Sequence, residues 1–199
     1  MIRQKPQAKT SPPVRAREVK VSPLVRLQWR KMLRLMVVYP DDLVLDAQCM
    51  EGTLLHQLMR RKPKARLCGA CFTPPQLRYA RQLVEQGDIM FADERDFPWI
   101  SESMDVAFIA RGLHALENPL ATLREMHRLL RKGGQTLIAG VCLPQPFRAL
   151  YNAAVFDERP QSRIRSRKEM TDLLRAAGFE QIYVVRAGLI SCVATGVKK

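Results

Sequence analysis

Four polar segments of the sequence stand where a ligand site could form. They cover residues 46–53, 71–74, 92–95 and 110–115, and each follows a short apolar run of the kind found in buried strands. In an open sheet of parallel strands, the ligand lies beyond the carboxyl ends of the strands. We therefore expect the four segments to meet at one edge of a sheet and to form one site.

Three side chains in these segments could carry chemistry. His114 follows the fourth apolar run, and a neutral imidazole there could act as a general base. The alternative is a loop histidine that packs on the next helix. Asp46 and Asp93 could accept hydrogen bonds from a ligand, but Asp also caps helices and stabilises turns. The residues alone leave both interpretations open.

The cysteines indicate neither a disulfide framework nor a metal site. There are five, at positions 49, 68, 71, 142 and 192, and an odd number argues against paired bridges. Cys68 and Cys71 have the C-x-x-C spacing of many zinc sites, but no second ligand pair occurs in the sequence. We expect buried thiols that pack as small apolar side chains.

Strands and helices alternate along most of the chain. The predicted strands are 43–45, 65–70, 89–92, 104–110, 135–141, 181–185 and 189–195, and the predicted helices are 52–61, 75–86, 120–130 and 167–177. Such alternation indicates βαβ units and a parallel sheet. The short turn at Ala187-Gly188 predicts an antiparallel hairpin at the end, and Lys132-Gly133-Gly134 predicts a helix stop. The predicted fold class is a Rossmann-like three-layer α/β sandwich with a mostly parallel seven-stranded sheet, a C-terminal antiparallel hairpin and an N-terminal helix.

The first 40 residues divide into two parts. Residues 1–22 combine prolines with basic residues and lack an apolar period, which predicts a flexible arm. Residues 23–40 carry apolar residues mostly at helical spacing. We expect a helix there that lies against the domain or covers the mouth of its site. The predicted domain spans residues 41–199.

The first polar segment also carries a motif. Residues 44–55 read VLDAQCMEGTLL, which resembles the S-adenosylmethionine (SAM)-binding motif of class I methyltransferases, V-L-D-x-G-C-G-x-G. Matching pieces follow in the order of that family at residues 69–71, 91–93, 104–108, 113–119, 123–134 and 176–179. The series is similar to the type 11 group of small-molecule methyltransferases and covers about residues 42–197.

The resemblance implies a site for SAM and a catalytic position. The implied cofactor-binding residues are Asp46, Ala47, Gln48, Gly52, Cys71, Phe72, Asp93, Glu94 and Ala110. Within this set, Asp46 would lie near the amino group of the cofactor, and Asp93 or Glu94 would accept from the adenine amino group. His114 stands where this group often has a histidine that faces the substrate, which implies a catalytic role. No metal is implied.

Three positions depart from the family motif. Gln48 and Met50 replace the first two glycines, which let the backbone turn sharply and approach the cofactor without a Cβ. Cys71 replaces the acidic residue that accepts both ribose hydroxyls. Because a hydrogen bond to a charged group contributes about 1.5–3 kcal/mol, its loss weakens binding by roughly tenfold to a thousandfold. The departures predict weak or absent SAM binding.

The chain is strongly basic. Lys and Arg number 33 against 19 Asp and Glu, a net charge of +14, and much of the surplus lies in the first 34 residues. Such a surplus favours polyanions and allows a nucleic-acid partner, although basic arms are as often simply solvated. No apolar run is long enough to span a membrane, and no signal peptide follows the start. We predict a cytoplasmic protein without a membrane partner.

Three functional hypotheses follow. The first is a SAM-dependent methyltransferase that acts on an unidentified, small-molecule acceptor. The second is a catalytically inactive methyltransferase-like binding or scaffold protein whose SAM binding is lost or weakened. The third is an RNA-directed methyltransferase or RNA-binding protein. The [DN]-P-P-[YFW] tetrapeptide and the Pro-Cys nucleophile of nucleic-acid methyltransferases are absent from the sequence.

Overall fold

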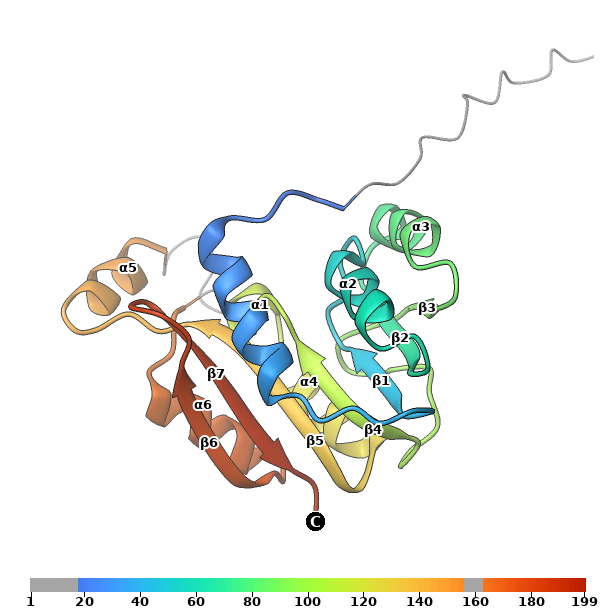
Figure 1. The fold of residues 1–199 in the computed structure, drawn as a ribbon. Helices are drawn as coiled ribbons and strands as arrows, with labels where there is room; N and C mark the ends of the chain where they lie inside the picture. Colours follow the sequence, from blue (N-terminus) through green and yellow to red (C-terminus); the bar gives the residue numbers. More distant parts are fainter. Residues whose placement is uncertain (1–17, 156–162) are drawn as a thin grey trace, which may run out of the picture.

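Seven strands form one sheet in the computed structural model, which describes residues 18–155 and 163–199. They are β1 (Leu43–Asp46), β2 (Arg66–Cys71), β3 (Asp88–Phe91), β4 (Met104–Ile109), β5 (Leu130–Val141), β6 (Glu180–Arg186) and β7 (Ser191–Val197). Their order is β3-β2-β1-β4-β5-β7-β6 (Figure 1). The first five run parallel, and β7 is antiparallel to both β5 and β6. The predicted fold class and its C-terminal hairpin are confirmed.

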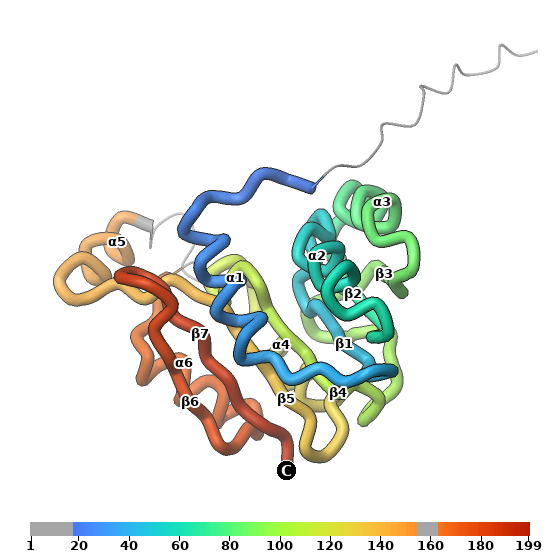
Figure 2. Tube along the Cα trace, in the orientation of Figure 1, coloured from blue at the N-terminus to red at the C-terminus, as the bar shows by residue number. Residues whose placement is uncertain are grey.

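Helices cover both faces of the sheet. One face carries α1 (Pro23–Leu35), α2 (Thr53–Arg61) and α3 (Pro74–Leu83), and the other carries η1 (Leu113–Ala115), α4 (Pro119–Leu129) and α6 (Arg167–Ala176). Figure 2 shows α1 crossing in front of β5 and β7, with which it is in contact. α5 (Phe147–Val155) projects from the edge of the molecule beyond the end of β5 (Figure 1). The apolar core therefore lies in two layers, one on each side of the sheet.

Three helices begin with the same local device, a capping side chain followed by proline. Ser22, Thr73 and Asn118 each accept a hydrogen bond from the backbone three residues on, and each is followed by a proline at the first helical position. The cap satisfies one free N–H of the first turn, and proline needs none there. Ser166 and Glu169 form a capping box at the start of α6. These starts are set by local sequence.

Two predicted boundaries are wrong. The helix predicted over residues 23–40 ends at Leu35, and Val37 N instead donates to Gln135 Oε1 at 3.1 Å as the chain continues extended. α4 ends at Leu129, and β5 begins at the next residue. Gly133 has a φ of 77° but lies within β5, where its N–H donates to Lys198 O at 2.7 Å. It therefore does not stop the helix.

Part of the predicted arm is packed on the domain. Val19 N donates to Thr53 Oγ1 at 3.2 Å, and Glu18 pairs with His56 Nδ1 at 2.7 Å. Residues 1–17 of the predicted arm lie outside the described residues. Among the described residues, no helix is long and apolar enough to cross a bilayer.

Candidate functional site

The loop between β1 and α2 lies across the ends of two neighbouring strands. Ala47 N donates to Phe108 O at 2.8 Å, and Cys49 N donates to Ala70 O at 2.9 Å. Gly52 ends the loop with a φ of 76°. A Cβ at this position would lie 3.0 Å from the side chain of Val84, the C-cap residue of α3. The loop thus occupies the carboxyl edge of the sheet, where the four polar segments were expected to meet.

Asp46 is buried beneath this loop. Only 1% of the residue is exposed, and its Oδ1 accepts from Gln48 N at 3.1 Å. Burial raises the pKa of Asp46 to about 7, although the bond from Gln48 and the charge of Arg111 oppose the rise. The carboxyl group therefore orders the loop, as a cap residue would, and is partly protonated at neutral pH.

Gln48 ties the loop to the segment after β4. The side chain is 3% exposed, and its Nε2 donates to Ala115 O at 3.1 Å. Its Oε1 is buried and has no hydrogen-bond partner among the described residues. A buried acceptor without a donor costs about 1–3 kcal/mol. A ligand group that donates a hydrogen bond to Gln48 Oε1 would therefore remove this cost.

Met50 occupies the space between the loop and the end of β2. Its φ of 51° lies in the left-handed region that glycine adopts without strain. Cys71 Sγ donates to Met50 O at 3.5 Å, and Gln76 Nε2 contacts Met50 Sδ at 3.6 Å. The two positions that depart most from the family motif are therefore in direct contact with each other.

Residues 18–36, here called the N-terminal cover, pack over the ends of the strands and close the site. Trp29 Nε1 donates to Ala110 O at 3.0 Å, and Gln28 Nε2 donates to Gly140 O at 3.0 Å. Both side chains are buried and reach the ends of β4 and β5 from α1. The prediction that this helix lies against the domain is confirmed, and its side chains reach the site.

The pocket between the cover and the loop is very small. Its volume is about 10 Å³, close to the least that holds one water. It is lined by Val19, Val21, Trp29, Asp46, Gln48, Cys49, Met50, Glu51, Thr53, Leu54, Ala110 and Arg111. The structure therefore brings Asp46, Gln48 and Ala110 together, but leaves no room for a ligand between them.

The other implied ligand residues make structural contacts. Asp93 Oδ1 accepts from Arg95 N at 2.8 Å, which is a turn contact. Glu94 accepts from Glu117 N at 3.0 Å and from Asn118 N at 2.7 Å, next to the start of α4. The turn interpretation of Asp93 thus has direct support. The binding of adenine by Asp93 or Glu94 stays a prediction.

The end of β2 does not assemble a metal site. Cys68 and Cys71 belong to the apolar layers on opposite faces of the sheet, as residues three apart in a strand must. Phe72 packs against Phe97, with ring centroids 6.3 Å apart. No group of three metal-ligating side chains occurs in residues 18–155 and 163–199. The C-x-x-C spacing does not bring both thiols to one ion.

His114 lies on η1 beside basic side chains. Burial lowers the pKa of His114, and the charges of Arg165 and Arg111 lower it further. The imidazole is therefore neutral at neutral pH, the form that a general base requires. The catalytic role of His114 stays a prediction.

Two residues of this region carried no signal in the sequence. Trp29 belongs to a helical apolar pattern, and nothing local indicates that its indole bonds to a strand 81 residues away. Cys142 directly follows the last residue of β5, and it is half-buried. A hydrogen bond involving Cys192 lowers the pKa of Cys142, and Arg167 lowers it further. A lone cysteine among prolines does not reveal such a partner.

Comparisons with known proteins agree with this arrangement. A family model described as "Methyltransferase domain", of type 11, matches residues 45–138. Malonyl-[acyl-carrier protein] O-methyltransferase of Hahella chejuensis is 30% identical over 73% of this chain, which spans 54% of that protein's length. Demethylmenaquinone methyltransferase of Alkalihalophilus pseudofirmus is 28% identical, with 85% of this chain and 84% of that protein covered. The chain spans about half the length of several curated relatives that it matches.

A solved structure shows the same fold. Geranyl diphosphate C-methyltransferase of Streptomyces coelicolor, in complex with S-adenosyl-L-homocysteine, superposes with a TM-score of 0.69 at 14% identity. The superposition covers 87% of this chain and 76% of that one. At this identity the likeness concerns the fold alone.

Proposed function

By sequence and fold the chain belongs to the class I SAM-dependent methyltransferases, and on this premise we propose that it methylates a small-molecule acceptor once the N-terminal cover has opened. One observation carries the proposal. The loop at residues 47–52 lies over buried Asp46 at the carboxyl edge of the sheet, where the family binds its cofactor. SAM is the cofactor of this family.

The closed conformation does not fit this cofactor. The pocket of about 10 Å³, which Trp29, Gln48 and Met50 help to line, holds about one water and is too small for any part of SAM. Cys71 contacts Met50 O directly, where a ribose would need room and an acidic partner. The closed form is therefore a resting state in this proposal, and binding requires the cover to move.

The relatives support a small-molecule acceptor. Their names specify a malonyl group on a carrier protein and a menaquinone precursor as acceptors. These two molecules share little chemistry, so the acceptor class stays broad. Neither name refers to a nucleic acid, and the third hypothesis gains no support from them. The neutral imidazole of His114 is the group we propose as base for an acceptor that must lose a proton.

A non-catalytic binding protein is the second candidate. It is favoured by the three departures from the motif, Gln48, Met50 and Cys71, of which Cys71 donates its thiol to the backbone O of Met50 in place of accepting from a ribose. A chain that had lost its cofactor would tolerate such a contact. Both candidates share the fold and differ in whether the site binds SAM at all.

Titration with S-adenosylhomocysteine tests the assigned site. The double variant Met50→Gly with Cys71→Asp restores the family's residues at these two positions, and it removes the Met50 side chain and the Cys71 thiol that donates to Met50 O. We expect it to bind the ligand at least about tenfold more tightly than the unaltered chain, because a charged hydrogen bond contributes about 1.5–3 kcal/mol. A correctly folded double variant that gains no affinity would contradict the assignment of this loop as the cofactor site.

A further inference from the structure

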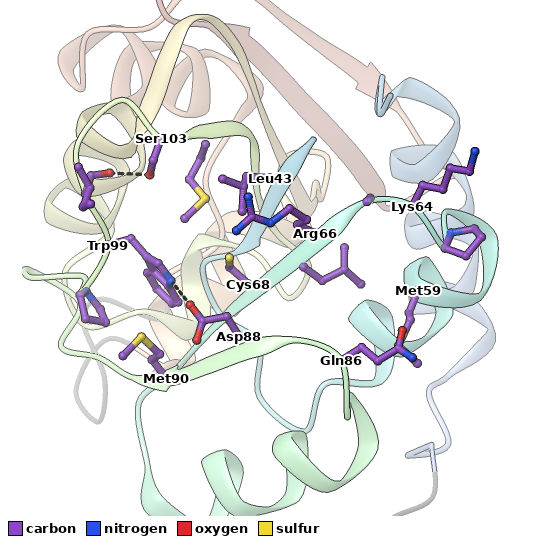
Figure 3. Close-up of a pocket in the computed structure, with 16 residues that line it drawn as sticks. Leu43, Met59, Lys64, Arg66, Cys68, Gln86, Asp88, Met90, Trp99 and Ser103 are labelled. Atoms are coloured by element: carbon purple, nitrogen blue, oxygen red, sulfur yellow. Dashed lines mark hydrogen bonds between the residues drawn. The ribbon is translucent and has the colours of Figure 1, made fainter. Parts of the chain in front are cut away.

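A second and much larger cavity lies at the opposite end of the strands. Its volume is about 590 Å³, within the range of small-molecule sites. Figure 3 shows its walls around the amino ends of β1, β2 and β3. It shares no lining residue with the pocket beneath the N-terminal cover. Methyl transfer at the carboxyl edge gives this cavity no role.

One wall of the cavity is a fixed aromatic ring. Trp99 Nε1 donates to Asp88 Oδ2 at 2.8 Å, and Trp99 O accepts from Arg128 Nη1 at 3.2 Å. Phe97 packs edge-on against the indole, with ring centroids 6.4 Å apart. The indole plane is therefore held by bonds at both its side chain and its backbone. A fixed ring binds a flat ligand at low entropic cost.

The floor of the cavity is apolar and uncharged. Cys68 and Met104 line it from one apolar layer of the core and are at most 2% exposed. Burial raises the pKa of Cys68 to about 12, so its thiol keeps its proton at neutral pH. The thiol therefore carries no negative charge, and the carboxylate that lines the cavity, that of Asp88, accepts the hydrogen bond from Trp99 Nε1.

Two basic residues line the cavity, Arg66 and Lys64, and the side chain of Arg66 extends over the floor. Figure 3 shows the Arg66 guanidinium directed over the cavity, between Leu43 and Cys68. Among the described residues, no carboxylate forms an ion pair with Arg66, whereas Arg128 and Arg131 have such partners. The side chain of neighbouring Lys64 points away from the cavity (Figure 3). Arg66 is thus the cation available to a bound ligand.

We propose that this cavity binds a flat aromatic molecule that carries one anionic group. The ring packs against Trp99 and the apolar floor, and the anion pairs with the guanidinium of Arg66. The site is separate from the cofactor site. A chain that bound such a ligand without transferring a methyl group would uphold this inference and contradict only the proposed function.

Two dyes that differ by one charged group test the proposal on the full chain. 8-Anilinonaphthalene-1-sulfonate carries a sulfonate, and N-phenyl-1-naphthylamine is its neutral counterpart. We expect one high-affinity site for the sulfonate and weaker binding of the neutral dye, measured by fluorescence titration. Arg66→Glu should weaken sulfonate binding at least about tenfold, the usual scale of a charge-assisted contact, and change the neutral dye less than about twofold.

Lys64→Glu is the matched control, since it makes the same charge change two residues away on a side chain that leaves the cavity. It should leave both affinities near those of the unaltered chain. Trp99→Ala should weaken both dyes. If that variant does not fold, Ser103→Trp fills the cavity from its rim and should block both. Equal losses in Arg66→Glu and Lys64→Glu, or unchanged binding when Trp99 is removed or the cavity filled, would overturn the proposal.

Discussion

Asp46 combines two conflicting demands, since a ligand site needs its charge and the core around it disfavours that charge. Burial raises the pKa of Asp46 from 3.8 to about 7. Between these values the native protein holds a proton that the unfolded chain has released. The unfolded state binds fewer protons there, so the stability contributed by this group falls as the pH rises through that interval.

Asp46→Asn should remove this loss. The amide still accepts the bond from Gln48 N and has no charge to bury. We expect the unaltered chain to lose stability between about pH 4 and pH 7, by an amount on the order of a few kcal/mol, and the variant to lose much less. Urea unfolding across this range measures the difference. Asp93→Asn, which changes an exposed carboxylate, should keep the original pH dependence of the unfolding free energy. If this variant also lost less stability between about pH 4 and pH 7, the effect could not be assigned to Asp46.

Cys142 should be the most reactive thiol of the described residues. Its hydrogen bond with Cys192 and the charge of Arg167 lower its pKa, whereas burial raises the pKa of Cys68 to about 12. The thiolate is the nucleophile, so reactivity follows these directions. Iodoacetamide at neutral pH, followed by peptide mass analysis, should modify Cys142 first. Early modification of Cys68, or unchanged labelling of Cys142→Ser, would contradict this expectation.

The sequence predicted part of the site residue by residue. The place of Asp46, Gln48 and Met50 at the carboxyl edge was predicted because they stand in a motif next to a strand, and a strand end fixes where its loop lies. Trp29 and Gln28 could not be found in this way. Their bonds to Ala110 and Gly140 join residues 81 and 112 positions apart, and a helical apolar pattern is the same whatever the helix packs on.

At the scale of elements, local rules predicted where helices start better than where they end. Helix starts are marked by capping side chains and proline, as at Thr73 and Asn118. The end of α1 is unmarked, because the apolar residues continue past Leu35 into an extended segment. α5 was not predicted, since its large side chains such as Phe147 and Leu150 are exposed and show no buried face.

The capping box of α6 gives a prediction for one element. Ser166 Oγ accepts from Glu169 N at 3.1 Å, and Glu169 Oε2 accepts from Ser166 N at 2.7 Å. Ser166→Ala should lower the free energy of unfolding by about 0.5–2 kcal/mol, because one cap bond is lost. Ser166→Asp keeps an acceptor and should retain most of the stability. Equal losses in the two variants, by urea unfolding, would show that the cap is not the cause.

At the scale of the molecule, one sheet separates two sites with different character. The carboxyl edge carries the segment that we propose as the cofactor site and is closed by the N-terminal cover, while the amino edge carries an open cavity with Arg66, which has no ion-pair partner among the described residues. The parallel sheet was predicted from the alternation of elements, and the hairpin was predicted from the short turn at Ala187-Gly188. The closure of the site could not be predicted in this way, because it depends on how residues 18–36 pack on the finished domain.

The proposed function requires the N-terminal cover to be a reversible barrier to the cofactor. Val19 and Val21 line the closed pocket, and Glu18 and Val19 bond to α2. Removing residues 1–21 takes these contacts away and keeps Ser22, the cap of α1. Removing only residues 1–17 leaves the contacts in place and serves as the matched control.

The deciding measurement is calorimetric titration of both truncated chains with S-adenosylhomocysteine. The chain without residues 1–21 should bind at least about tenfold more tightly than the chain without residues 1–17, because opening the rest of the cover costs less free energy once the contacts of residues 18–21 are absent. The control should bind as the full chain does. Equal affinities for the two truncated chains, or no binding by either at millimolar ligand, would contradict the closed-enzyme account and favour a protein that has lost its cofactor.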